Sequence, residues 1–167
     1  MSVTDDLSVG IVGASGVVGR TVMADLDHSS LSIGELRLFG SARSEGRSIS
    51  YAGQMIEVEL LQMDRLTDLD LVFLCAGGAI SRELAPELRK ACGLVVDSSS
   101  VYRHDETVPL IIPEINGEEI REHQGLVANP NCSTAIALMA MAPLHKAFGL
   151  KRVIAATYQA VSGAGQA

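Results

Sequence analysis

The sequence has no apolar run long enough to cross a lipid bilayer. Its longest such run, residues 135–143, is far shorter than the roughly 20 residues that a transmembrane helix needs. The N-terminus carries Asp5 and Asp6 where a secretory signal peptide would carry basic residues. We therefore expect a cytoplasmic protein with no membrane partner.

Cysteine and basic residues are also scarce. The three cysteines, Cys75, Cys92 and Cys132, are odd in number and show no metal-ligand spacing, which favours a reducing compartment and no metal site. The net charge of −7, with no basic block, argues against nucleic acid and anionic membranes as partners. The expected partner is a small molecule, and an anionic substrate would have to be held by local arginines.

The remaining composition is that of a globular protein. Hydrophobic residues make up 47% of the 167 residues, charged residues 20%, and 16 glycines punctuate the chain. A chain of this length supports one domain that buries about 68 to 70% of its unfolded surface. One domain is expected, with the beginning of a second.

Strand and helix patterns alternate along the chain. Short apolar runs predict strands, apolar residues at helical spacing predict helices, and period-two alternation predicts an antiparallel excursion over residues 48–61. This order predicts an α/β fold with a doubly wound, mostly parallel, Rossmann-like sheet. The predicted strands are 7–12, 35–39, 70–75, 94–97 and 126–128, the helices 20–26, 80–91, 118–122 and 135–147, and residues 113–117 a turn. A long strand at 151–161, followed by a glycine loop, resembles the first strand of a second, missing α+β domain for substrate binding and dimerisation.

A glycine-rich turn follows the first predicted strand and precedes the first helix. Gly13, Gly16 and Gly19 stand at three-residue intervals, which departs from the standard G-x-G-x-x-G of dinucleotide sites. An ordinary tight turn is the alternative, but the strand–turn–helix context favours a pyrophosphate resting on the helix N-terminus. A second glycine turn, containing Gly77, follows the strand at 70–75 and indicates the same ligand-binding crevice.

The end of the second predicted strand indicates which dinucleotide is bound. An NAD site places a carboxylate there, about 20 residues beyond the glycine turn. This sequence instead has Ser41, Arg43 and Ser44, a guanidinium and two hydroxyls suited to a 2′-phosphate. NADP is therefore predicted in preference to NAD, although Glu45 weakens the positive field and a solvated loop remains the alternative.

The segment 129–134 places Cys132 directly before a long apolar helix pattern. A cysteine there lies near the positive end of the helix dipole, among unpaired backbone N–H groups, and both features favour the nucleophilic thiolate. Asn131, Ser133 and Thr134 add polar groups close to the sulfur. The alternative is a small residue packed behind a helix cap.

Several of these motifs together resemble aspartate-semialdehyde dehydrogenase. The resemblance runs nearly end to end but covers only about the first half of that family's usual length, and it is carried most specifically by the segment around Cys132 with the later pair Tyr158 and Gln159. The stretches concerned are 13–19, 41–44, 97–103, 113–116, 129–134 and 157–165.

The resemblance implies NADPH-dependent reductive dephosphorylation of L-aspartyl-4-phosphate to aspartate semialdehyde, on the route to lysine (through diaminopimelate), threonine and methionine. It implies that Cys132 is the nucleophile of a thioacyl intermediate and that Asn131 lies beside the oxyanion. Gln159 would orient the substrate and Arg103 would hold its phosphate. The implied cofactor residues are Gly13, Ser15, Gly16, Val17 and Val18 at the pyrophosphate and Ser41, Arg43 and Ser44 at the 2′-phosphate. Gly163 and Gly165 would lie on the nicotinamide side, and Gly77 would line the same crevice.

The resemblance further implies an NADP-binding domain over residues 1–131, the start of a catalytic domain over 132–167, and a homodimer for the full-length protein. Ser98 stands where many family members have asparagine. The family's catalytic histidine and its substrate-carboxylate arginine lie in the part of the family's length that this chain does not cover, and the four histidines of this chain match none of its motifs. N-acetyl-γ-glutamyl-phosphate reductase, or a non-catalytic NADP-binding fragment or paralogue, is the alternative.

Overall fold

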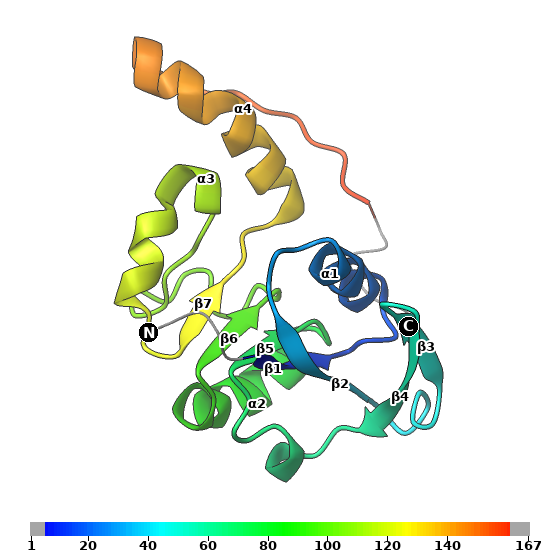
Figure 1. Ribbon diagram of the computed structural model, residues 1–167. Helices are drawn as coiled ribbons and strands as arrows, with labels where there is room; N and C mark the ends of the chain where they lie inside the picture. Colours follow the sequence, from blue (N-terminus) through cyan, green and yellow to red (C-terminus); the bar gives the residue numbers. More distant parts are fainter. Residues whose placement is uncertain (1–5, 161–167) are drawn as a thin grey trace.

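The computed structural model describes residues 6–160 and is built on one seven-stranded sheet of order β3-β4-β2-β1-β5-β6-β7 (Figure 1). All neighbouring strands pair in parallel except β3 and β4, which form an antiparallel hairpin. The strands are β1 Leu7–Val12, β2 Ile33–Gly40, β3 Ser48–Tyr51, β4 Gln54–Leu60, β5 Leu71–Leu74, β6 Leu94–Asp97 and β7 Leu126–Ala128. The helices are α1 Val17–Asp27, α2 Gly78–Ala91, α3 Pro113–Asn116 and α4 Cys132–Phe148, with 3-10 turns η1 Met63–Arg65 and η2 Gly117–Glu122.

The sheet is doubly wound around β1. The chain adds β2 and then β4 on one side of β1, and returns to add β5, β6 and β7 on the other. Two hydrophobic clusters form the core: Met23 and Leu26 of α1 belong to one, Leu84 and Leu88 of α2 to the other. The two helices therefore cover opposite faces of the sheet, as predicted for this fold class.

The register of the parallel strands aligns their carboxyl ends. Val12 pairs with Leu74, Leu74 with Asp97, and Asp97 with Ala128. On the other side of β1, Val12 pairs with Phe39 near the end of β2. The segments that follow these five strands, which hold most of the predicted site residues, consequently lie along one edge of the sheet.

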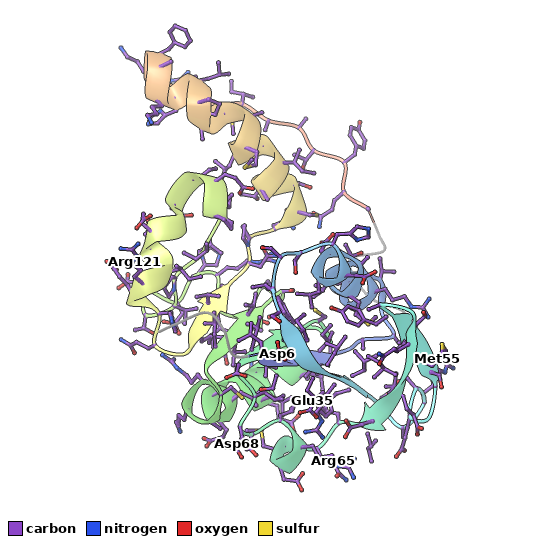
Figure 2. The ribbon with its side chains drawn as sticks, in the orientation of Figure 1. Asp6, Glu35, Met55, Arg65, Asp68 and Arg121 are labelled. Atoms are coloured by element: carbon purple, nitrogen blue, oxygen red, sulfur yellow. The ribbon has the colours of Figure 1, made fainter. Side chains whose placement is uncertain are left out.

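Helix α4 projects away from the sheet, and the chain that follows it is exposed (Figure 1). None of its residues is buried, and Ile136 and Phe148 are 74% and 81% exposed. In Figure 2 the side chains of α4 extend outward along its whole length. No helix among residues 6–160 is long and apolar enough to cross a membrane.

The prediction of a strand at 151–161 is wrong for the residues described. Residues 151–160 form no secondary structure and are exposed throughout. Their apolar pattern suits a strand, but a strand needs a neighbour with which to pair, and none lies beside them among residues 6–160. Residue 161 and the predicted glycine loop lie outside the described residues.

Smaller differences concern the ends of helices. Residues 113–117, predicted as a turn, form the short helix α3, with Pro113 at its first position and Gly117 already in η2. Residues 118–122 form a 3-10 helix rather than an α-helix. Helices α1 and α4 each begin three residues before the predicted start, because the prediction places residues 17–19 in the glycine turn and because residues 132–134 lie outside the apolar pattern of α4.

Substitution of Gly13 tests the packing between the turn after β1 and the end of β5, at the carboxyl edge of the sheet. Its φ is +85°, and an added Cβ would lie 2.9 Å from the backbone of Cys75 and Ala76. Gly53 has φ +77° but open space around it. We expect Gly13→Ala to lower the free energy of unfolding by about 3 kcal/mol, since strain and overlap add. Gly53→Ala should cost only about 1 kcal/mol.

Urea unfolding of the two variants measures this difference. Equal losses of stability would show that the turn after β1 is not closely packed against the end of β5.

Candidate cofactor and cysteine site

The turn after β1 presents the N-terminus of α1. The Gly13 N–H donates to the carbonyl of Phe39 at 2.8 Å, and the Gly16 N–H donates to the carbonyl of Gly13 at 3.0 Å. Gly16 is the N-cap of α1, and no side chain caps its first turn. The leading N–H groups of α1 are thus left for an anion, the arrangement that binds a pyrophosphate.

The side chains of this turn leave its backbone open to a ligand. Val17 and Val18 are 58% and 38% exposed. Ser15 is half-buried and Gly16 exposed. An added Cβ on Gly19 would lie 2.5 Å from the carbonyl oxygen of Gly13, so only glycine allows α1 to start this close to the turn.

The segment after β5 forms a second exposed helix N-terminus. Gly77 has φ +88° and is the N-cap of α2, again without a side-chain cap. An added Cβ on Gly77 would meet nothing within 4 Å, so glycine is needed there for its backbone angle rather than for space. Cys75, directly after β5, is half-buried, and burial raises the pKa of its thiol to about 11.

The segment after β2 contains the residues predicted to bind a 2′-phosphate. Ser41 and Arg43 are exposed, as is Glu45. Ser44 is buried, and its hydroxyl donates to the carbonyl of Ser41 at 3.0 Å. Ser44 therefore closes the turn that presents Ser41 and Arg43, which gives it a structural contact that the sequence did not reveal.

Arg103 joins the segments that follow β6 and β7. Its Nε donates to the carbonyl of Asn129 at 2.9 Å and its Nη2 to the carbonyl of Ser98 at 3.2 Å. The guanidinium is thereby fixed in orientation, while Nη1 makes no hydrogen bond within residues 6–160. The structure thus places Arg103, which is predicted to bind phosphate, next to the segment that leads to Cys132.

Cys132 is exposed and is the first residue of α4. The Asn131 side chain caps the helix, its Oδ1 accepting from the backbone N–H groups of Ser133 and Thr134 at 3.1 and 3.4 Å. The prediction that the N–H groups around the sulfur are unpaired is therefore wrong for these two. Because Oδ1 is occupied, the Nδ2 of Asn131 is the part of the amide that can donate to a ligand.

The remaining predicted site residues are not assembled with Cys132. Gln159 is exposed in the segment without secondary structure. Gly163 and Gly165 lie outside the described residues.

Three polar residues form a contact that sequence reasoning missed. Asp97, at the end of β6, is fully buried and is bonded to Ser81 of α2 and to Ser99. A charged residue at the end of a buried strand, followed by serines, was the available signal.

Comparison with known proteins decides the family. Residues 8–123 match the family described as "Semialdehyde dehydrogenase, NAD binding domain". The chain belongs to this family. It is 41% identical over 159 residues to the aspartate-semialdehyde dehydrogenase of Bacillus subtilis, covering 95% of this chain and 46% of that protein. It is 42% identical over 160 residues to that of Aquifex aeolicus, covering 94% and 47%.

Solved structures show the same fold. The chain superposes on aspartate semialdehyde dehydrogenase II from Vibrio cholerae with a TM-score of 0.82 and 35% identity, covering 87% of this chain and 48% of that one. The dehydrogenase from Candida albicans, 22% identical, has the same fold with a TM-score of 0.70, covering 87% and 48%. The chain spans about half the length of the relatives it matches.

Thiol reactivity tests the exposure of Cys132. We expect a disulfide reagent at pH 8 to modify Cys132 at least tenfold faster than the other two thiols, because only the thiolate reacts. Burial raises the pKa of both Cys75 and Cys92. Stopped-flow measurement should show a fast phase that Cys132→Ala removes.

The matched control is Cys75→Ala, which should keep the fast phase. Loss of that phase in Cys75→Ala would show that Cys132 is not the exposed, reactive thiol.

Proposed function

We propose that this chain is the NADP-binding, N-terminal half of an aspartate-semialdehyde dehydrogenase. The reaction would be reductive dephosphorylation of L-aspartyl-4-phosphate to aspartate semialdehyde, with Cys132 as the nucleophile. The observation that carries this proposal is the placement of an exposed cysteine, at a helix N-terminus, on the same sheet edge as two glycine turns and Arg43. The relative from Vibrio cholerae was solved in complex with ASA.

The residues present fit a dinucleotide. The uncapped N-terminus of α1 offers backbone N–H groups to a pyrophosphate, which would lie against the turn formed by Gly13, Ser15 and Gly16. Val17 and Val18 are exposed beside it. Gly77, with open space around its Cα, allows a ligand to approach the backbone at the neighbouring strand end.

NADP rather than NAD is supported by the end of β2. No carboxylate stands within residues 40–44, whereas Ser41 and Arg43 are exposed there. A guanidinium binds a 2′-phosphate through two parallel hydrogen bonds, and a hydroxyl adds a third donor. Ser44 would support these contacts by holding the turn closed.

The proposed chemistry starts at the Cys132 sulfur. Its thiolate would attack the acyl carbon of aspartyl phosphate, form a C–S bond, and break the C–O bond to phosphate, which leaves with the electron pair. Bound NADPH would supply a hydride to the resulting thioester. The C–S bond would then break, releasing the aldehyde and regenerating the thiolate.

Two side chains would stabilise the charges that develop. The free Nδ2 of Asn131 can donate to the oxyanion, a contribution that is typically about 3 kcal/mol in enzymes. The free Nη1 of Arg103 can donate to the phosphate, with the other guanidinium nitrogens already fixed on carbonyls. Gln159 would orient the substrate once its segment approaches Cys132.

We place the boundary between cofactor and catalytic domains at residues 131 and 132. Among residues 6–160, every buried hydrophobic side chain except that of Pro130 precedes Asn129, and α4 buries none. The full-length protein would be a homodimer. Three free thiols suit the reducing cytoplasm.

Cofactor preference tests the role of Arg43. We expect Arg43→Ala to weaken NADP⁺ binding about tenfold, the usual value for one charged hydrogen-bonded pair, and to leave NAD⁺ binding within twofold. Calorimetric titration of the 167-residue chain measures both. Arg121→Ala is the matched control, because this exposed arginine of η2, labelled in Figure 2, pairs with Glu118 away from β2.

Equal affinity of the wild-type chain for NADP⁺ and NAD⁺ would contradict the assignment of the 2′-phosphate site.

Phosphate-dependent NADPH formation from aspartate semialdehyde and NADP⁺ by the full-length protein tests the chemistry, because the resemblance places the catalytic histidine outside this chain. We expect turnover to vanish in Cys132→Ala and to persist in Cys75→Ala, since only the exposed thiol can reach a substrate. Binding of NADP⁺ without turnover in the wild type would favour the non-catalytic alternative. Turnover of N-acetylglutamate semialdehyde instead would favour the reductase.

A further inference from the structure

Asp97 is a fully buried carboxylate held by hydroxyl and backbone donors. Its Oδ1 accepts from the Ser81 hydroxyl at 2.6 Å and the Ser99 N–H at 3.1 Å, and its Oδ2 accepts from the Ser99 hydroxyl at 2.7 Å. None of the ion pairs formed within residues 6–160 includes it. A buried carboxylate is costly unless its hydrogen bonds are satisfied, and these three satisfy it.

The hydrogen bond from Ser81 links Asp97 to the glycine turn after β5. Ser81 lies in the first turns of α2, and its N–H donates to the carbonyl of Gly77 at 3.1 Å. The carboxylate also lies towards the N-terminal end of α2, where the helix dipole favours negative charge. Asp97 therefore fixes the start of α2 against β6.

The other two hydrogen bonds fix the loop after β6. The Ser99 hydroxyl, besides donating to Asp97, accepts from the Val101 N–H at 3.1 Å. Two residues later the chain reaches Arg103, whose guanidinium bonds back to the carbonyl of Ser98. Hydrogen bonds thus hold residues 97–103 together as one loop, and the buried charged residue in this loop is Asp97.

The same loop is tied to the segment before Cys132. Arg103 donates to the carbonyl of Asn129, and the Asn129 N–H donates to the carbonyl of Asp97 at 2.8 Å. A ring therefore runs from the Asp97 carboxylate to Ser99, along the backbone to Ser98, whose carbonyl accepts from Arg103, and from Arg103 through Asn129 back to the main-chain carbonyl of Asp97. The orientation of Arg103 depends on this ring, because its Nε and Nη2 are both held by it.

We propose that Asp97 is a positioning residue, whose carboxylate holds Ser99 so that Arg103 presents its free Nη1 to a phosphate group beside Cys132. This inference rests on the proposed function for the identity of the ligand. It assigns no contact between Asp97 and the substrate. The carboxylate acts through Ser99 and the loop after β6. Its hydrogen bond to Ser81 also holds the glycine turn after β5 in a fixed position relative to this loop.

The Arg103 Nε–H provides a direct spectroscopic readout. We expect Ser99→Ala to accelerate hydrogen exchange at this group about fivefold, the ratio that corresponds to loss of one hydrogen bond. Ser99→Thr, which keeps the hydroxyl, should restore the wild-type rate. Asp97→Asn should accelerate exchange further. The Nδ2 of the asparagine is a donor and cannot accept a hydrogen bond from Ser99 as the carboxylate oxygen does.

Thr107→Val is a matched control. Thr107 donates through its N–H and hydroxyl to Asp105, two residues earlier, in the same pattern that Ser99 makes with Asp97, but both residues are exposed. This variant should leave Arg103 exchange within twofold of wild type. Equal exchange rates in Ser99→Ala and Thr107→Val would overturn the proposal, even if Asp97→Asn failed to fold.

Titration with inorganic phosphate, followed at the Arg103 Nε–H, separates this inference from the proposed function. We expect Ser99→Ala to weaken phosphate binding about fivefold and to leave NADP⁺ affinity within twofold. Phosphate weakening of the same size in Thr107→Val would overturn the positioning role. If phosphate does not shift the Arg103 signal in the wild type, the phosphate role in the proposed function fails, and the exchange rates still decide the role of Asp97.

Discussion

The aligned carboxyl ends of the parallel strands are the constraint on which the rest of the structure depends. Val12, Leu74, Asp97 and Ala128 pair in register, so the turns after β1, β5, β6 and β7 begin at one level of the sheet. The order in which strands are added reverses at β1, so α1 and α2 lie on opposite faces of the sheet. Ligands of open α/β sheets bind at such a point. Cys132 follows β7 by only a few residues and so reaches the same edge.

Close backbone packing makes this edge specific. Gly13 approaches the backbone after β5 more closely than any side chain allows, and Gly19 does the same to the turn itself. Along β6 and β7, charged hydrogen bonds add to the apolar packing, with Asp97 bonded to Ser99 and Arg103 joining the segments that follow the two strands. The cofactor side is therefore shaped by the absence of side chains, and the cysteine side by charged hydrogen bonds. Both depend on the strand register to bring their parts together.

The sequence predicted the sheet well where strands are continuous apolar runs. Residues 7–12, 94–97 and 126–128 were predicted with the observed ends, since buried parallel strands are bounded by glycine and polar residues. The strand at 151–161 failed because a strand depends on a partner, which its own residues do not encode. The positions of the glycine turns and of Cys132 at helix N-termini were predicted correctly, because the residue types and spacing that start a helix are local.

The contacts of Asp97, Ser44 and Asn131 could not be predicted in the same way. One of the two hydroxyls that donate to Asp97 belongs to Ser81, sixteen residues earlier on a helix, and only the folded sheet brings the two together. The sequence predicts that Ser44 binds the 2′-phosphate, but its side chain is buried and donates to the carbonyl of Ser41 within the same turn. Asn131 was recognised as polar and near the sulfur, yet its capping of α4 depends on where the helix begins.

Chemical-shift mapping of NADP⁺ on the ¹⁵N-labelled chain tests the central claim most directly. If the carboxyl edge of the sheet is the ligand site, the largest shifts fall on the backbone amides of residues 13–19, 41–44 and 76–78. The contrary result is a set of shifts centred elsewhere, for example on the cavity of about 450 Å³ lined by Arg89, Tyr102 and Gln124. That outcome would place the dinucleotide away from Cys132 and contradict a ligand site at the carboxyl edge.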